Sequence, residues 1–224
     1  MISVIIPTLD AAARIGPCLY ALSPAIIDPV LSEVIFADGG SDDDIEEIAE
    51  ATGARLVRAD RGRGAQLAAG AEAARGDWFL FLHADTVLSE DWVEVARAHI
   101  EQGPERAGYF RLAFAAKGFG PRLVAGWGNL RSRLFGLPFG DQALLIHRGL
   151  YQRVGGFQRI PLMEDVAIAR ALSGRLTSLP ATATTDFERY QRQGWVKRGA
   201  ANLWLQARYF AGASPEALAD EYRR

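Results

Sequence analysis

The sequence predicts an α/β protein organised around a mostly parallel sheet, and three observations carry this prediction. Short apolar segments alternate with helical patterns from residue 2 to about residue 102, as in parallel strands joined by right-handed crossovers. Residues 78–82 are apolar without interruption, which is typical of a strand buried on both faces. Polar and charged side chains follow each of the first four predicted strands, and open α/β sheets bind ligands at the carboxyl ends of their strands.

Length and composition limit the class of protein. The chain has 224 residues, of which 49% are hydrophobic and 23% charged, enough for one sizeable core but few for two independent domains. Its net charge of −2 gives no reason to expect nucleic acid as a partner. The single cysteine, Cys18, excludes an internal disulfide, and no apolar run approaches the ~20 residues needed to cross a bilayer. We therefore expect one cytoplasmic domain.

The first half of the chain is expected to hold four parallel strands and the helices between them. Residues 2–6 are rich in β-branched side chains and stop at Pro7, which predicts a central strand. Gly53 and Gly76 mark the ends of two of the helices. The predicted strands are 2–6, 33–38, 55–58 and 78–82, and the predicted helices are 11–22, 44–52, 65–74 and one that begins at 91–94.

The second half is less regular. Residues 109–114 alternate between apolar and polar like a half-exposed strand. Residues 118–140 are rich in Gly and Arg, and they suggest a helix flanked by loops that could shape a pocket. The other predicted strands are 143–147 and an edge strand at 176–179, and the other predicted helices are 149–154, 163–172, 195–210 and a final one capped by residues 214–216.

The residues that follow the fourth strand suggest a metal site. His83 and Asp85 place an imidazole and a carboxylate where the strand leaves the sheet. A carboxylate at that position can hold a divalent cation, and such a cation commonly serves a phosphate. Alternatively, Asp85 could cap the next helix, but Ser89 and Asp91 lie nearer to the start of that helix. We favour the metal and phosphate role.

Two further strand ends carry candidate binding residues. Asp38 precedes Gly39-Gly40, so a ligand could approach the backbone closely and the carboxylate could accept hydrogen bonds from a ribose or a base. The alternative is that Asp38 only stabilises its turn. Arg61 and Arg63 suit a diphosphate, because guanidinium groups bind phosphate in bidentate fashion, although arginines in exposed loops can also be idle.

Several common active sites can be excluded. The run 62–67 begins like a dinucleotide-binding loop, but Leu67 stands where the third glycine belongs, and no phosphate-binding loop ending in Gly-Lys-Ser/Thr is present. A nicotinamide enzyme or a common ATPase is therefore disfavoured. The three histidines, His83, His99 and His147, lack the spacing of zinc ligands. No serine or cysteine stands in a recognisable nucleophile turn.

A second acidic site is Glu164-Asp165, at the start of the predicted helix 163–172. A carboxylate there could act as a general base if it faced the crevice. Equally, the two residues could simply be acids that stabilise the first turn of a helix. Spacing alone leaves both interpretations open.

Taken in order, these residues resemble glycosyltransferase family 2, enzymes of the GT-A fold. The marks are the run 4–10, the run 38–43, His83-Ala84-Asp85 and Glu164-Asp165. The runs 61–66, 140–142 and 214–216 look like a compact bacterial subgroup associated with radical-SAM and selenoprotein genes. The resemblance implies a Rossmann-like three-layer sandwich with added C-terminal helices. It divides the single domain 1–224 into a nucleotide-binding half at about 1–102, an acceptor half at about 103–189 and a helical segment at about 190–224.

The same resemblance implies a function. The protein would be a metal-dependent, inverting enzyme that moves a sugar from a UDP- or GDP-linked donor to an acceptor hydroxyl. Mn²⁺ or Mg²⁺ on Asp85 would face the donor diphosphate, and Asp165 would be the catalytic base with Glu164 beside it. The implied donor-binding residues are Pro7, Thr8, Asp10, Asp38, Gly39, Arg61, Arg63, Ala84, Asp85, Arg189 and Arg192. The implied acceptor residues are Gly140, Asp141 and Gln142.

This chain departs from the family pattern in three places. Ala68-Ala69-Gly70 stands where many relatives carry an Asn before the Gly, which removes one polar contact near the donor. His83 stands where the first acid of the metal motif is usual, so Asp85 would be the only acidic ligand, with His83 as a second candidate ligand. Metal affinity would then depend on the bound donor. Residues 191–195 only partly match the Gln-x-x-Arg-Trp motif of the family, so the assignment of Arg189 or Arg192 to the diphosphate is loose.

Other functions stay open at this stage. A nucleotidyltransferase also places carboxylates and arginines around a sheet edge but releases pyrophosphate, and a sugar-nucleotide-binding module without activity would explain His83. The segment 195–210, with Lys197, Arg198 and Arg208 among apolar residues, could lie on the inner face of an anionic membrane and reach a lipid acceptor. Such a helix can instead pack on its own domain or on a partner in a homodimer.

Overall fold

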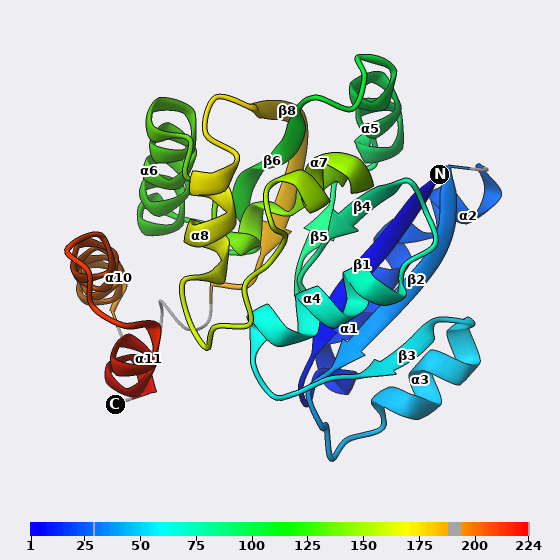
Figure 1. The fold of residues 1–224 in the computed structure, drawn as a ribbon, viewed down its shortest axis with the longest axis horizontal. Coiled ribbons are helices and arrows are strands. Elements are labelled where there is room, and N and C mark those ends of the chain that lie inside the picture. Colours follow the sequence, from blue (N-terminus) through cyan, green and yellow to red (C-terminus); the bar gives the residue numbers. More distant parts are fainter. Residues whose placement is uncertain (29, 188–193, 224) are drawn as a thin grey trace.

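The computed structural model describes residues 1–28, 30–187 and 194–223. Within them, one eight-stranded sheet has the order β3-β2-β1-β4-β7-β6-β8-β5, with helices on both faces (Figure 1). The strands are β1 (Ile2–Thr8), β2 (Leu31–Asp38), β3 (Arg55–Arg58), β4 (Trp78–Phe81), β5 (Val87–Leu88), β6 (Ala107–Phe114), β7 (Leu144–His147) and β8 (Leu176–Thr185). The helices are α1 (Ala12–Leu22), α2 (Pro24–Ile27), α3 (Ile45–Thr52), α4 (Arg63–Ala73), α5 (Trp92–Glu101), α6 (Phe119–Phe135), α7 (Arg148–Arg153), α8 (Glu164–Ala171), α10 (Trp195–Phe210) and α11 (Pro215–Arg223), with a 3-10 turn η1 (Gly140–Gln142).

The first four strands form the parallel part of the sheet, as predicted. β1 lies between β2 and β4, and β3 pairs with the outer side of β2. Pro7 is tolerated inside this central strand for a geometric reason. The carbonyl of Ile5 accepts the last bond from β4, at Leu82, and Pro7 faces the same side one step beyond the end of β4. Its missing N–H therefore leaves no gap in the ladder.

The sheet separates two apolar cores, which confirms the predicted three layers. Ile2, Val4 and Ile6 face α1, α3 and α5 on one side, where Trp92 is completely buried. Ile5 faces the other side, where α4, α7 and α8 cover the sheet. Alternation of buried residues along β1 thus supplies both cores. Cys18 lies in the first core as a buried thiol on α1, and burial, with the charge of Asp85 adding to it, raises its pKa to about 12.

The prediction was wrong about the last strand. β8 runs on to Thr185 and lies inside the sheet, parallel to β6 and antiparallel to β5. The two-residue strand β5 forms the edge instead. β8 accommodates Pro180 because its pairing with β6 shifts register between Tyr109 and Arg111. A bulge of this kind tolerates a residue that cannot donate a hydrogen bond to the ladder. A strand as short as β5 leaves no pattern in the sequence.

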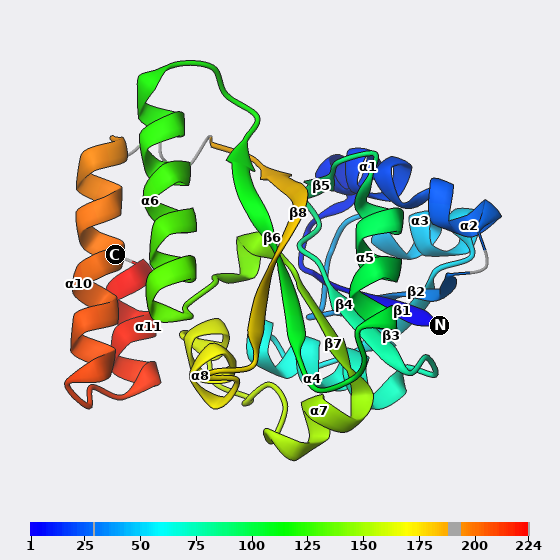
Figure 2. The same ribbon diagram turned by 90° about the horizontal axis from the view of Figure 1, so that it is seen from above.

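The described helices include none that is long and apolar enough to cross a bilayer. The carboxyl ends of β1, β2 and β4 lie together at one end of the parallel strands. The first turns of α4 and α8 lie near the same end (Figures 1 and 2).

The contact between α4 and β1 depends on a small residue at position 70. A β-carbon on Gly70 would lie 2.4 Å from Cγ2 of Ile5, so we expect Gly70→Ala to lower the free energy of unfolding by about 1–3 kcal/mol. Gly126→Ala is the matched control, because Gly126 is an exposed helical glycine with no atom within 4 Å of the added carbon; it should gain about 0.5–1 kcal/mol. Urea unfolding measures both, and equal stability of the two variants would contradict this packing.

Candidate active site

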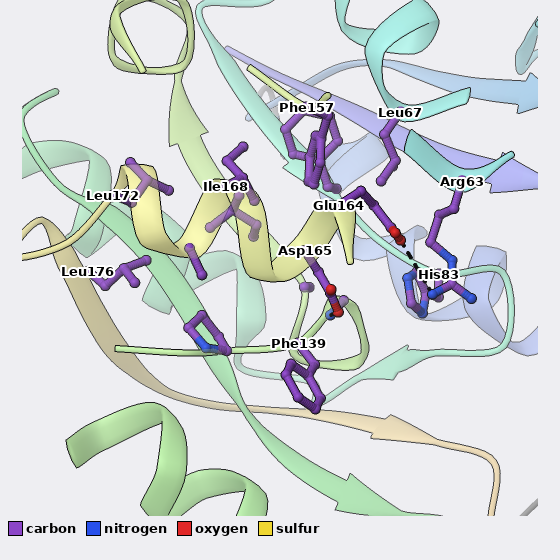
Figure 3. Close-up of a pocket in the computed structure, with 16 residues that line it drawn as sticks. Arg63, Leu67, His83, Phe139, Phe157, Glu164, Asp165, Ile168, Leu172 and Leu176 are labelled. Atoms are coloured by element: carbon purple, nitrogen blue, oxygen red, sulfur yellow. Dashed lines mark hydrogen bonds and ion pairs between the residues drawn. The ribbon is translucent and has the colours of Figure 1, made fainter. Parts of the chain in front are cut away.

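Three adjoining cavities open beside the ends of β1 and β4 in the described part of the chain, and Arg63, His83 and Glu164 line all of them. The inner pocket runs along α8 and is mostly apolar, with about 460 Å³ of empty volume (Figure 3). The central cavity, about 1010 Å³ with its opening to solvent, is lined by both Asp85 and Asp165. The outer cleft, about 1200 Å³ measured the same way, includes Pro7, Arg61, Ala84 and Asp85 in its lining.

The first turn of α4 brings Arg63 to the cavities. Gly64 makes this approach possible, because a β-carbon there would lie 2.2 Å from the carbonyl oxygen of Gln158 and 2.8 Å from that of Ile160. Nη1 of Arg63 then lies 3.5 Å from Oε1 of Glu164, whose side chain is almost fully buried. The glycine and the arginine of this sequence run therefore act together to join α4 to α8.

Two adjacent carboxylates begin α8 after Met163, which adopts a left-handed conformation with φ 69°. Burial, together with the charge of Asp165, raises the pKa of Glu164, and the charge of Arg63 opposes this shift. Glu164 points toward Arg63, whereas Asp165 lies beside Phe139 (Figure 3). Its Oδ2 accepts from the Gly140 N–H at 3.1 Å and its Oδ1 from the Val166 N–H at 2.7 Å. The two acids thus differ in surroundings, and Asp165 is the one held by backbone groups at the cavity wall.

His83 is fixed by η1. Its Nδ1 lies 3.1 Å from Oδ1 of Asp141, and its Nε2 packs so closely on Gly140 that a β-carbon there would lie 2.5 Å away. Burial raises the pKa of Asp141, but the hydrogen bond and charge of His83 and the charges of Arg63 and Arg131 hold it below the ordinary value. Asp141 therefore engages one ring nitrogen of His83, and the role of His83 as a metal ligand stays a prediction.

Asp85 is exposed at the end of β4. Oδ1 of Asp85 accepts a long hydrogen bond from the Thr185 hydroxyl at 3.5 Å. Over the described residues, no group of three or more histidine, cysteine or acidic side chains could enclose a metal ion. This donor set fits Mg²⁺ or Mn²⁺ held by one carboxylate together with substrate phosphates and water, and does not fit a closed all-protein site.

Asp38 lies behind the cavities. It is fully buried. Its carboxylate accepts hydrogen bonds from the hydroxyls of Thr8 and Ser41 and from the backbone N–H groups of Gly40 and Ser41. It also forms an ion pair with Arg58. Burial raises the pKa of Asp38, but these hydrogen bonds outweigh it and hold the pKa below its ordinary value. These contacts match the alternative role of stabilising the turn, and contact with a nucleoside stays a prediction.

The other residues predicted on these loops have similar structural partners. The Asp10 carboxylate accepts from the Asp42 N–H at 3.0 Å. Gln66 donates to the Thr8 and Ala37 carbonyls, and Gly39 packs against its amide. Of the predicted nucleoside residues, Pro7 lines the outer cleft directly. Arg189 and Arg192 lie outside the described residues.

Gln142 does not take the predicted acceptor role. Its side chain is completely buried, accepting from the Ser132 hydroxyl at 2.5 Å and donating to the Phe110 carbonyl at 3.1 Å. It therefore anchors η1 to α6 and β6, while Gly140 and Asp141 face the cavities.

The C-terminal helices contribute cavity residues that the sequence did not indicate. Asn202, Leu205 and Gln206 of α10 and Tyr222 of α11 line the central cavity. The only pattern in the sequence of α10 is its apolar stripe. That stripe lies on the side of the helix away from these cavity residues, so it does not point to them.

The raised pKa of Glu164 predicts a pH-dependent stability. The folded protein holds this proton more tightly than the unfolded chain does, so this contribution is present below pH ~4.3 and is lost as the pH rises through the folded pKa. The melting temperature of Glu164→Gln relative to that of the unmodified protein should therefore rise from pH 4 to pH 8. Glu50→Gln, at an exposed position on α3, serves as the control. A difference for Glu164→Gln that does not change with pH would contradict the assignment.

Similar structures show the same fold. Residues 1–349 of TarS from S. aureus superpose with a TM-score of 0.65 at 17% identity, covering 83% of this chain and 60% of that one. Glucosyl-3-phosphoglycerate synthase from Mycobacterium tuberculosis, in complex with Mn²⁺, UDP and glucosyl-3-phosphoglycerate, gives 0.55 at 22% identity over 83% of this chain and 70% of that one. The GT-A fold that the sequence resemblance implied is thereby confirmed.

Sequence relatives and a family model define the family. The PGL/p-HBAD biosynthesis glycosyltransferase of Mycobacterium tuberculosis is 31% identical over 169 residues, 70% of this chain and 63% of that protein. The glucosyl-3-phosphoglycerate synthase of Mycolicibacterium paratuberculosis is 36% identical over 95 residues, 38% of this chain and 29% of that protein. The chain thus spans less than two thirds of these relatives. The sequence model described as glycosyl transferase family 2 matches residues 3–137, and the chain belongs to this family.

Proposed function

We propose that this protein transfers a sugar, with inversion, from a nucleotide-diphosphate donor to an acceptor hydroxyl in a metal-dependent reaction. The observation that carries the proposal is that Asp85 and Asp165 line one cavity. One is an exposed carboxylate suited to a cation and a phosphate, and the other is a carboxylate held by two backbone N–H groups. A sugar between them could be attacked on one side while its diphosphate leaves on the other.

The outer cleft suits the donor. Arg61 and Arg63 reach it from the start of α4, and Asp85 reaches it from the end of β4. Guanidinium groups bind diphosphate oxygens in bidentate fashion. A divalent cation on Asp85 would supply Lewis-acid stabilisation of the leaving diphosphate. Arg63 is also positioned by Glu164, so the predicted catalytic role of Glu164 would be exercised through that arginine.

Asp165 would take the proton of the acceptor hydroxyl. The acceptor oxygen forms a bond to the anomeric carbon as the bond from that carbon to the diphosphate oxygen breaks. The electron pair of that bond leaves with the nucleoside diphosphate. Attack and departure on opposite faces give inversion through an oxocarbenium-like transition state, and no covalent intermediate on the protein is required. Hydrogen bonds from Gly140 and Val166 keep the Asp165 carboxylate oriented toward the cavity.

The comparisons support a uridine nucleotide as the first donor to test. Similar structures are described as complexes with UDP-GlcNAc in TarS and with UDP-glucose and Mn²⁺ in glucosyl-3-phosphoglycerate synthase. Membership of the family argues against the nucleotidyltransferase alternative. Four points stay predictions: the subgroup suggested by the runs 61–66, 140–142 and 214–216, the diphosphate contacts of Arg189 and Arg192, the homodimer and the cytoplasmic location.

The base assignment has a direct test in Asp165→Asn. Removing a general base costs about 10²–10⁴-fold in turnover, so transfer should be lost while calorimetry shows donor binding unchanged. Asp77→Asn is the matched control, because Asp77 is an exposed acid at the opposite end of β4. Full transfer activity in Asp165→Asn would show that another group accepts the proton.

A further inference from the structure

Helices α6 and α10 lie side by side at one end of the molecule, away from the parallel strands (Figures 1 and 2). Their outer surface, here called the α6–α10 face, is apolar. On α6 five of the six exposed large apolar residues recur every three or four positions, so these five share one side of the helix. The face consists of Phe119, Leu123, Trp127, Leu130 and Leu134 on α6 and Val196, Leu203, Trp204 and Phe210 on α10.

The two helices present one continuous surface. Trp127 of α6 and Leu203 of α10 are both exposed, and both line a groove of about 510 Å³ between the helices. Gly120 lies against the Trp195 indole, with an added β-carbon 3.3 Å from Cδ1, which brings the helices close together. Apolar surfaces of this extent on a protein mark a binding site for another molecule or a membrane.

The charge of the face indicates the partner. Neither helix contains an acidic residue, although the chain as a whole has 27 acids against 25 lysines and arginines. Arg122, Arg133 and Lys197 are exposed and make no ion pair within the described residues. A two-fold dimer through this face would bring like charges together. An anionic bilayer complements both features, because amphipathic helices insert their apolar side while cations bind lipid headgroups.

The groove also leads to the active site. Gln206 lines both the groove and the central cavity that holds Asp165. Gln206 is 6% exposed, and its Nε2 has no hydrogen-bond partner among the described residues. A buried donor without a partner is costly unless a ligand satisfies it. Asp141, the middle residue of η1, lines both spaces as well.

We propose that the α6–α10 face docks on an anionic membrane surface and that the acceptor is an amphiphile. Its apolar tail lies in the groove between Trp127 and Leu203, its polar head accepts a hydrogen bond from Gln206, and its hydroxyl reaches Asp165. The acceptor part deepens the proposed function and rests on it, whereas membrane docking stands on the surface alone.

Docking is tested by co-sedimentation of the full chain with vesicles of phosphatidylcholine alone or mixed with phosphatidylglycerol. Binding should require phosphatidylglycerol and fall with added salt. The double variant Leu134→Glu, Trp204→Glu should lose it, and Tyr20→Glu, an 82% exposed aromatic on α1, should not. Arg122→Gln and Arg133→Gln should each weaken binding about fivefold. No pelleting of the unmodified protein at low salt, or a dimer in solution that the double variant dissociates, would overturn docking.

The acceptor class is tested with two probes that share a head group, octyl β-glucoside below its micelle concentration and methyl β-glucoside. The octyl compound should bind at least about tenfold tighter, because its added methylenes are buried, and Trp127→Glu should remove the difference. Equal binding of the two probes would overturn the amphiphile. Binding of UDP and of GDP, each with Mn²⁺, is measured in parallel. If neither nucleotide binds while vesicles still do, the proposed function is overturned. If a nucleotide binds but neither the probes nor the vesicles do, only this inference is overturned.

Discussion

A buried carboxylate beside an arginine joins the two halves of this molecule. Glu164 begins α8 in the second half, and Arg63 begins α4 in the first. Taking a carboxylate out of water is costly, and a partner of opposite charge with close packing is needed to offset the cost. Gly64 allows α4 to approach the loop before α8 until its backbone meets the carbonyl oxygens of Gln158 and Ile160. All three cavities border on this pair, so the shape of the site depends on it.

From this junction the remaining site geometry follows. Because α8 begins at Glu164, the next residue, Asp165, projects toward η1 and is held by the Gly140 N–H. Gly140 in turn packs on His83, and Asp141 binds the other side of that ring. The histidine that replaces an acid in the family pattern thus acts as a structural partner of η1. Asp85 and Glu164 both line the cleft, but Glu164 is paired with Arg63. A cation on Asp85 would therefore need the phosphates of the donor as further ligands.

Much of this arrangement could be predicted from the sequence. Strand–helix alternation indicated the parallel strands, and the residues that follow β1, β2 and β4 were correctly placed at one edge of the sheet. The orientation of the side chains could not be predicted. Asp38 turns inward because five donors surround it, and Gln142 turns inward because Ser132 and Phe110 satisfy its amide. Part of each set of partners comes from residues distant in the sequence, such as Thr8 and Arg58 for Asp38 and Phe110 for Gln142. The cavity residues of α10 were also missed, because that helix shows no periodic signal beyond its apolar stripe.

The central claim is that a donor-dependent metal site on Asp85 serves sugar transfer. Calorimetric titration of the protein with UDP, GDP, UDP-glucose and GDP-mannose, each with and without Mn²⁺, tests it most directly, with Asp85→Asn in parallel. One nucleotide family should bind, Mn²⁺ should strengthen this binding, and Asp85→Asn should remove the strengthening without unfolding the protein. Binding that is equally tight with and without Mn²⁺, or a metal effect that survives in Asp85→Asn, would contradict the claim.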